Sequence, residues 1–211
     1  MTNLSTRNPG PRLDNQSPEL FGQTPSQTVG PFFHYSLPWK GGADLVGKSD
    51  MGARPDLFPV VDLRGRVLDG QGKAVPDALL EIWQANGAGR YASPADRRDG
   101  LSLDPHFIGF GRASTSAEGE YHFRTMRPGR VPGPAATLQA PHIALSVFGR
   151  GLLKRLATRI YFSDCLENDA DPILMSVPAR RRETLIARRR GNDWWFDIVL
   201  QGTGETVFFA L

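Results

Sequence analysis

The sequence has a single cysteine, Cys165, among its 211 residues. One thiol can form neither an intrachain disulfide nor a cysteine-based zinc site, so packing and hydrogen bonds must hold the fold together. We expect Cys165 to be a small buried side chain, as most free cysteines are.

Long apolar runs are missing as well. No stretch is long and apolar enough to be read as a membrane-spanning helix. The first residues, MTNLSTRNPGPRLDNQSPELFGQ, lack the basic end, apolar middle and small-residue cleavage site of a signal peptide. We therefore expect a cytoplasmic protein that does not enter a membrane.

The sequence has only a small excess of positive charge, with a net charge of +3. Its basic residues gather late, in the segment ARRRETLIARRRGN. No interleaved aromatic side chains that could stack on bases accompany this cluster, so we predict no nucleic-acid binding. The segment is interpreted either as a solvated helix or turn, with a short helix in PARRRETLIARRR, or as an ion-paired surface against a partner chain.

General catalytic and metal-binding motifs are absent too. The histidines form no H-E-x-x-H or H-x-H pattern, and there is no G-x-S-x-G elbow or G-x-x-x-x-G-K phosphate loop. Nor does a G-x-G-x-x-G run open a helix. These motifs alone leave a domain of unassigned role.

What is present, from Val60 onward, is a series of short β-type segments separated by turn residues. VVDLRGRVL and ALLEIWQA flank Asp69–Gly72, whose glycines allow the positive φ of a tight reversal, which predicts a hairpin or a closely related pair. The pattern favours a mostly β fold, a single antiparallel β-sandwich with an irregular N-terminal arm and minor helix.

Two segments alternate clearly enough to assign their faces. In EYHFRT, Tyr121, Phe123 and Thr125 share one face of the expected strand. In HIALSVF, the face of His142 and Ala144 is opposite to the apolar face. We divide the chain into a flexible N-terminal tail (1–23), an N-terminal arm and connection (24–58) and a β-sandwich core domain (59–211).

Seven blocks of sequence carry a family resemblance, which extends from about Thr24 to the C-terminus. Together they resemble the intradiol ring-cleavage dioxygenases, and within that family the alpha chains that pair with an iron-bearing beta chain. The blocks, in order, are TPSQTVGPFFH, LLEIWQANGAGRY, GFGRASTSAEGEYHFRTMRPG, APHIALSVFGRG, TRIYFSD, RRETLIARR and FDIVLQGTGETVFF.

The resemblance implies a β-sandwich of the intradiol dioxygenase type and an enzyme subunit. Its partner would be the beta subunit, in a higher hetero-oligomer of alpha–beta pairs. The complex would use O2 to open the ring of protocatechuate between its two hydroxylated carbons, giving 3-carboxy-cis,cis-muconate.

The family's metal centre is implied to be a non-haem Fe(III) held by two tyrosines and two histidines, an anionic ligand set that suits this ion. Tyr91 stands at the first tyrosine position and His142 at the first histidine position, but Val131 and Ala144 replace the other two ligands. We predict that this chain binds no metal and carries no catalytic residue, that the beta subunit binds the Fe(III), and that Tyr91 and His142 are remnants of a degenerate site.

The arm is implied to complete the partner's substrate pocket. By motif, Thr28, Gly30 and Pro31 would line it, followed by Phe32, where many relatives have tyrosine. Arg150 would bind the substrate carboxylate, because a guanidinium can hold a carboxylate bidentately.

Other interpretations remain open. Arg150 could be an ion-paired surface arginine at a strand end, and we expect Arg112 and Arg159 to be structural, anchoring strand ends or the interface. The segment GRVLDGQGKAVPDALLEI also fits a non-catalytic transthyretin-like interaction module, which would have no need for the arm. A one-chain dioxygenase is disfavoured by Val131 and Ala144.

Overall fold

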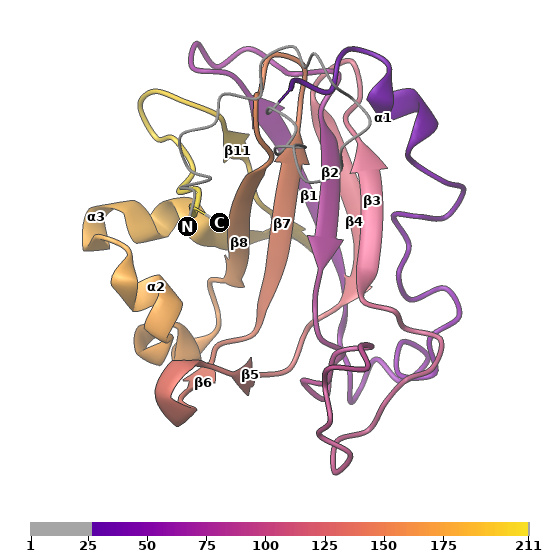
Figure 1. The fold of residues 1–211 in the computed structure, drawn as a ribbon. Coiled ribbons are helices and arrows are strands. Elements are labelled where there is room, and N and C mark those ends of the chain that lie inside the picture. Colours follow the sequence, from indigo (N-terminus) through magenta and orange to yellow (C-terminus); the bar gives the residue numbers. More distant parts are fainter. Residues whose placement is uncertain (1–26, 211) are drawn as a thin grey trace, which may run out of the picture.

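The computed structural model describes residues 27–210, so the predicted tail (1–23) and the first residues of the arm (24–26) lie outside the described range. The described chain is mostly β (Figure 1). Its α-helices and 3-10 helices are α1 (Phe33–Ser36), η3 (Pro134–Ala136), η4 (Leu166–Ala170), α2 (Pro172–Ser176), α3 (Ala179–Arg182) and η5 (Glu183–Leu185). Its strands are β1 (Val60–Leu68), β2 (Leu79–Trp83), β3 (Phe110–Ser114), β4 (Glu120–Met126), β5 (Val131–Pro132), β6 (Leu138–Gln139), β7 (His142–Phe148), β8 (Leu156–Phe162), β9 (Ile186–Arg190), β10 (Asp193–Trp195) and β11 (Ile198–Val199).

The strands form two layers that enclose the core. β8, β7, β2 and β3 lie side by side at the front of Figure 1, and β1 and β4 lie behind them. The side chains between the layers, among them Leu63 and Phe123 from the back and Ile82, Leu145 and Ile160 from the front, are fully buried and belong to one apolar cluster. The expected sandwich is therefore present.

The sheet is mixed, so the prediction of a purely antiparallel sandwich was wrong. β1 pairs in parallel with β10 and β11, and β8 pairs in parallel with β9. The chain between β8 and β9 contains η4, α2, α3 and η5, and such a crossover is what a parallel pair requires. The remaining pairs are antiparallel.

The reversal at Asp69–Gly72 is present, but its flanking strands do not form a hairpin. The Asp69 carboxylate accepts hydrogen bonds from the backbone N–H groups of Gln71 and Lys73, and Gly72 has a φ of 76°. Leu68, the last residue of β1, forms a single bridge with Ala74. β1 itself pairs with β4 in the back layer, whereas β2 pairs with β3 and β7 in the front layer.

The faces predicted from alternation are confirmed. Tyr121, Phe123 and Thr125 are buried along β4, and the apolar face of β7 is buried throughout. The arginine-rich segment begins as helix, in α3 and η5, and ends as strand β9, which extends toward β10 through Gly191. Cys165 is buried, as expected, and its thiol lies 3.1 Å from a Glu167 carboxylate oxygen.

Within residues 27–210, no helix is long and apolar enough to span a membrane.

Candidate functional site

His142 begins β7 and is buried among polar groups. Its Nδ1 lies 2.8 Å from the carbonyl oxygen of Ala140, and because a carbonyl only accepts, Nδ1 carries the proton and Nε2 is left with the lone pair. Burial, reinforced by the charge of Arg159, lowers the pKa of His142 to about 4. The imidazole is therefore neutral near pH 7.

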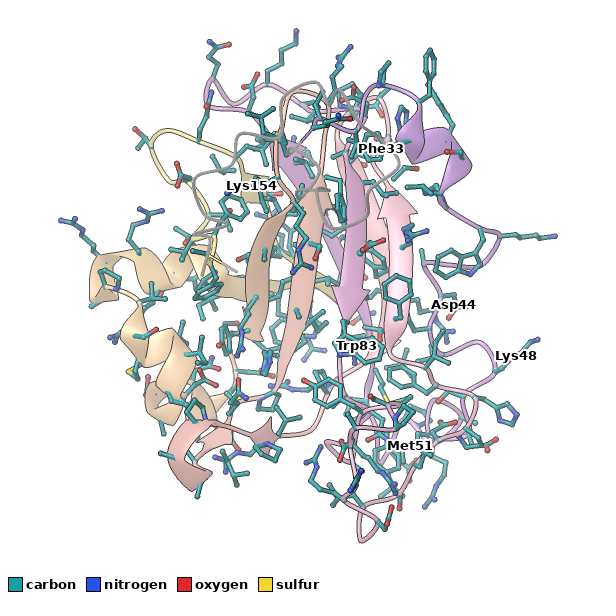
Figure 2. The ribbon with its side chains drawn as sticks, in the orientation of Figure 1. Phe33, Asp44, Lys48, Met51, Trp83 and Lys154 are labelled. Carbon is teal, nitrogen blue, oxygen red and sulfur yellow. The ribbon has the colours of Figure 1, made fainter. Side chains whose placement is uncertain are left out.

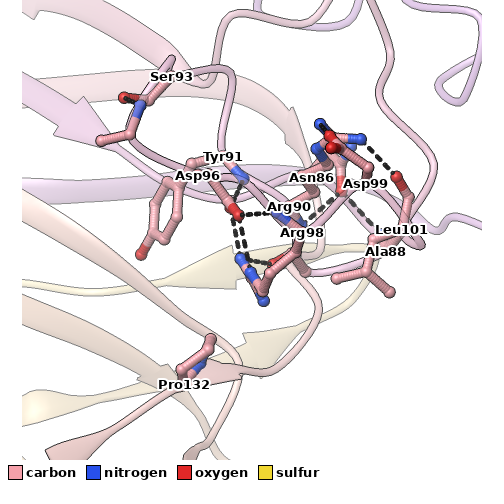
Figure 3. A network of polar contacts seen from close by, with 12 residues as sticks. Asn86, Ala88, Arg90, Tyr91, Ser93, Asp96, Arg98, Asp99, Leu101 and Pro132 are labelled. Atoms are coloured by element: carbon pink, nitrogen blue, oxygen red, sulfur yellow. Dashed lines mark hydrogen bonds and ion pairs between the residues drawn. The ribbon is translucent and has the colours of Figure 1, made fainter.

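Tyr91 follows the turn after β2 and is held by a polar network (Figure 3). Its backbone N–H donates to the Asp96 carboxylate, which forms an ion pair with Arg98. The aromatic ring extends away from this network and stacks on Trp83, with ring centroids 5.8 Å apart. Burial raises the pKa of the Tyr91 phenol, although the charges of Arg159 and Arg98 oppose that effect.

Val131 and Ala144 lie close to Tyr91 and His142. Val131 and Tyr91 line one hollow, together with Trp83 and Gln139. Ala144 lines a neighbouring hollow, which also includes Trp83. Ala144 pairs with Trp83 across β7 and β2 and with Arg159 across β7 and β8, and the charge of Arg159 acts on both Tyr91 and His142. The four predicted metal-site positions therefore lie around the end of β2 that carries Trp83, which Figure 2 labels.

Arg159 also lies at this place, although the sequence predicted only a structural role for it, as an anchor of a strand end or of the interface. It pairs with Ala144 across β7 and β8, and its guanidinium donates to the Gln139 side chain at 2.5 Å. Its charge acts on Tyr91, His142 and Tyr161. Alternation in TRIYF already puts Arg159 and Tyr161 on one face, but only the register of β8 against β7 reveals that they face His142 and Ala144.

Asp171 was also missed. Its fully buried carboxylate accepts hydrogen bonds from the Tyr161 hydroxyl, the Ala140 N–H and the first backbone N–H groups of α2. It thereby joins the N-terminus of α2 to β8 and to the residues that lead into β7. The pattern Asp171-Pro172 before a short apolar helix is an N-cap signal that the sequence does contain.

The described residues at this place fit a ferric ion poorly. Of the four ligand positions, only Tyr91 and His142 offer donor atoms, whereas Val131 and Ala144 offer none. The nearby Asp171 carboxylate is already taken up by the Tyr161 hydroxyl and by backbone N–H groups. A permanently charged guanidinium lies among the donors and disfavours a second cation. Burial also favours the protonated phenol of Tyr91, whereas a ferric ion binds the phenolate.

One other group of potential metal ligands lies among residues 27–210, formed by Asp50, Asp104 and His106. The Asp104 carboxylate is already taken up by the Ser49 hydroxyl and the backbone N–H groups of Met51 and His106, which fold the connection between arm and core. Asp50 and His106 are exposed. We interpret this group as structural.

The predicted substrate-binding residues gather elsewhere. Thr28 Oγ1 accepts a hydrogen bond from the backbone N–H of Gly151 at 2.8 Å, which fastens the arm beside Arg150. Gly30 has a φ of 76°, a conformation that favours glycine, and turns the chain toward Pro31 and the exposed Phe32.

Arg150 forms an ion pair within this chain. Its Nε lies 2.9 Å from the Asp77 carboxylate, and the arginine side chain is 63% exposed whereas that of Asp77 is 14% exposed. This pairing agrees with the ion-paired interpretation of Arg150. It also orients the guanidinium.

The arm and the degenerate metal site lie at opposite ends of the front layer. His142 begins β7, and Arg150 and Gly151 follow its end. A strand of seven residues is roughly 20 Å long at about 3.3 Å per residue. Figure 1 shows the same separation: the described start of the arm, up to α1, lies at the upper ends of the strands, whereas β5 and β6 lie below the lower ends; the rest of residues 24–58 runs down past β3. Thr28 and Arg150 therefore cannot act on a ligand held at Tyr91 and His142 of the same chain.

These features can be compared with known proteins. A family model described as dioxygenase matches residues 46–202, which include Tyr91, Val131, His142 and Arg150. The chain therefore belongs to the intradiol ring-cleavage dioxygenase family, whose members use non-haem Fe(III).

The chain is similar to individual members of this family over almost its whole length. It is 43% identical to the protocatechuate 3,4-dioxygenase alpha chain of Burkholderia cepacia, covering 89% of this chain and 96% of that one. The alpha chain from Pseudomonas putida is 40% identical, with 90% and 98% covered. The beta chain of Burkholderia cepacia is 37% identical, with 92% and 81% covered.

Solved structures share the fold. The dioxygenase domain of a dioxygenase carbohydrate-binding protein fusion from Streptomyces sp. SirexAA-E has a TM-score of 0.55 and 27% identity, covering 85% of this chain and 98% of that one. Catechol 1,2-dioxygenase of Acinetobacter radioresistens has a TM-score of 0.57 at 18% identity, covering 83% of this chain and 59% of that one.

Proposed function

We propose that this chain is the alpha subunit of a protocatechuate 3,4-dioxygenase and that it acts together with an iron-bearing beta subunit. The similarity to alpha chains over nearly the full length carries this proposal. The complex cleaves the bond between the two hydroxylated ring carbons of protocatechuate. Both atoms of O2 enter the product, 3-carboxy-cis,cis-muconate.

In this proposal the chain holds no iron, and the Fe(III) is bound by the beta subunit. Val131 and Ala144 in place of donors, together with the Arg159 guanidinium among the two remaining donors, support it. Tyr91 and His142 then have packing and hydrogen-bonding roles, which agrees with the stacking on Trp83 and the contact with Ala140.

The chain's contribution to the reaction is to bind and orient the substrate at the partner's site. Thr28, Gly30, Pro31 and Phe32 would line the wall around the aromatic ring, and Arg150 would bind its carboxylate. The hydrogen bond between Thr28 and Gly151 supports a common role, because it places the arm and Arg150 together at one end of the molecule.

Several exposed apolar side chains support assembly through the arm. An exposed apolar cluster of this kind marks an interaction site, and the arm carries Val29, Phe32, Tyr35, Leu37 and Trp39. We propose a cytoplasmic hetero-oligomer of alpha–beta pairs in which residues 24–58 serve as the partner-facing arm and 59–211 as the core domain. The transthyretin-like alternative is not favoured, because the dioxygenase match spans residues 46–202.

The test is to purify the chain alone and after co-expression with a beta chain, and to measure iron content and protocatechuate-dependent O2 uptake of both preparations. We expect iron and O2 uptake only in the co-purified complex. Stoichiometric iron together with turnover in the isolated chain would contradict the proposal, and so would a failure of the two chains to co-purify.

A further inference from the structure

A cavity of about 600 Å³ opens on the outer face of the front layer, beside the degenerate metal site. Cavities that bind small molecules generally have volumes of about 300 to 1,000 Å³. Trp83, Phe110, Ile173 and Phe209 give this cavity aromatic and aliphatic walls. Its size and walls suit a single aromatic ring.

The side chains that line the cavity carry a net positive charge. Arg155 and Arg159 both line it, and neither has a carboxylate within ion-pair distance among residues 27–210. Within the described part of the chain, the Arg155 guanidinium donates to the Ser146 hydroxyl at 3.3 Å, and the Arg159 guanidinium donates to the Gln139 amide oxygen. Glu81 is the acidic residue in the lining, and its carboxylate is neutralised by Arg112 at 2.5 Å.

Arg155 immediately precedes β8 and Arg159 lies on it, four residues further along the chain. Both line the cavity, together with the small side chains of Ala144 and Ser146 from β7. A small side chain at position 144 thus has two effects. It removes a donor from the metal site, and it opens space in front of the Arg159 guanidinium.

We propose that this cavity binds an aromatic carboxylate, without a metal and without turnover, as a second site distinct from the one that Arg150 and the arm serve. Arg159 and Arg155 hold the carboxylate by charge-assisted hydrogen bonds, and Trp83, Phe110 and Phe209 enclose the ring. The two guanidinium groups exclude a metal cation, and a neutral aromatic molecule leaves them without an anion.

The experiment uses the purified full chain and radiolabelled 4-hydroxybenzoate, which lacks the second hydroxyl group of a catechol and so is not cleaved. Equilibrium dialysis is expected to find one molecule bound per chain. Arg159→Gln and, separately, Arg155→Gln weaken binding at least tenfold, whereas the matched control Arg188→Gln, an exposed arginine that pairs with Glu183 outside the cavity lining, leaves it unchanged. Because Arg155 is exposed, its replacement keeps the test informative if Arg159→Gln does not fold.

Two further measurements test whether the ligand must carry a carboxylate and whether the site is also present in the alpha–beta complex. Neutral 4-hydroxybenzamide is expected to bind at least tenfold more weakly than the carboxylate. In the co-purified complex, dialysis is expected to count two molecules per alpha–beta pair, one of which is lost with Arg159→Gln. Equal binding of the amide, binding that is insensitive to both arginine variants, or a single site per pair would overturn the proposal. None of these outcomes affects the assignment as an alpha subunit, which depends on iron content and O2 uptake.

Discussion

At the scale of single residues, His142 connects the degenerate site to stability. Its pKa of about 4 lies below the ordinary value of 6.5, so between these values the unfolded chain binds a proton that the folded chain does not. The free energy of unfolding should therefore fall as the pH is lowered from about 6.5 to 4, by about 3 kcal/mol at 1.36 kcal/mol per unit.

Urea unfolding of the chain at pH values from 7 to 4 measures this effect. The His142→Gln variant is expected to show a flatter dependence on pH, because it removes the titrating group. The exposed His106, replaced by glutamine, is the control and should leave the dependence as it is. The same steep dependence in His142→Gln as in the unchanged chain would show that another group is responsible.

Arg150 gives the second prediction at this scale. In the assembled complex, Arg150→Ala should raise KM for protocatechuate about tenfold to a hundredfold, because a charge-assisted hydrogen bond is lost, worth about 1.5 to 3 kcal/mol. KM for catechol, which has no carboxylate, should hardly change.

Asp77 should act through Arg150 as a positioning residue, since its carboxylate holds the guanidinium at 2.9 Å. Asp77→Asn is expected to raise KM for protocatechuate by a smaller factor than Arg150→Ala and to leave kcat nearly unchanged. Lys154→Ala is the matched control, because Lys154 lies in the same exposed loop as Arg150. Equal effects on protocatechuate and catechol would remove the carboxylate role from Arg150.

At the scale of elements, Gly65 decides how the back layer closes. A Cβ at this position would lie 1.8 Å from the carbonyl oxygen of Phe196, to which the Tyr121 hydroxyl also donates at 2.6 Å. β1 therefore passes so close to the segment between β10 and β11 that only glycine fits.

Gly65→Ala should accordingly lower the free energy of unfolding by about 3 kcal/mol, at the upper end of overpacking costs. Gly100→Ala is the control, because a Cβ there meets nothing within 4 Å, and its effect should stay within about 0.5 kcal/mol. Chemical denaturation of the two variants compares them directly. Similar stabilities would mean that the backbone shifts at little cost.

How far the elements could be predicted depends on whether the signal is local. Alternation determined the buried faces of β4 and β7 correctly, because it concerns neighbouring residues. Strand partners are not local: Leu63 pairs with Trp194, far along the chain, so the parallel pairs and the lack of a hairpin at Asp69–Gly72 could not be inferred.

The same limit applies to the candidate site. The motif blocks located Tyr91, Val131, His142 and Ala144, which lie around the end of β2 that carries Trp83. Arg159 was missed because its position opposite Ala144 depends on the register of two strands. The roles assigned to Thr28 and Arg150 remain predictions, although the hydrogen bond between Thr28 and Gly151 now joins them.

At the scale of the whole molecule, the exposed apolar arm should control assembly. Phe32 and Tyr35 are both 76% exposed, and burying them in an interface would contribute about 1.5 to 3 kcal/mol each. The double replacement Phe32→Ser and Tyr35→Ser should therefore reduce the fraction of chain that elutes with the beta subunit in size-exclusion chromatography.

Leu166→Ser is the matched control for assembly, because Leu166 is 87% exposed but belongs to η4, outside the arm. It should leave the elution profile unchanged. Full assembly of the arm variant, or an equal loss with Leu166→Ser, would show that the arm does not provide the interface.

The separation of roughly 20 Å between the arm and the degenerate site also has a consequence for how the two subunits evolve. In the proposed complex, a substitution at Thr28 or Arg150 changes turnover at a metal centre that another gene encodes. Such a substitution would be selected through the performance of that second polypeptide. The two genes would then be expected to change together, and pairing an alpha chain with the beta chain of a distant species should lower activity even where the two still assemble.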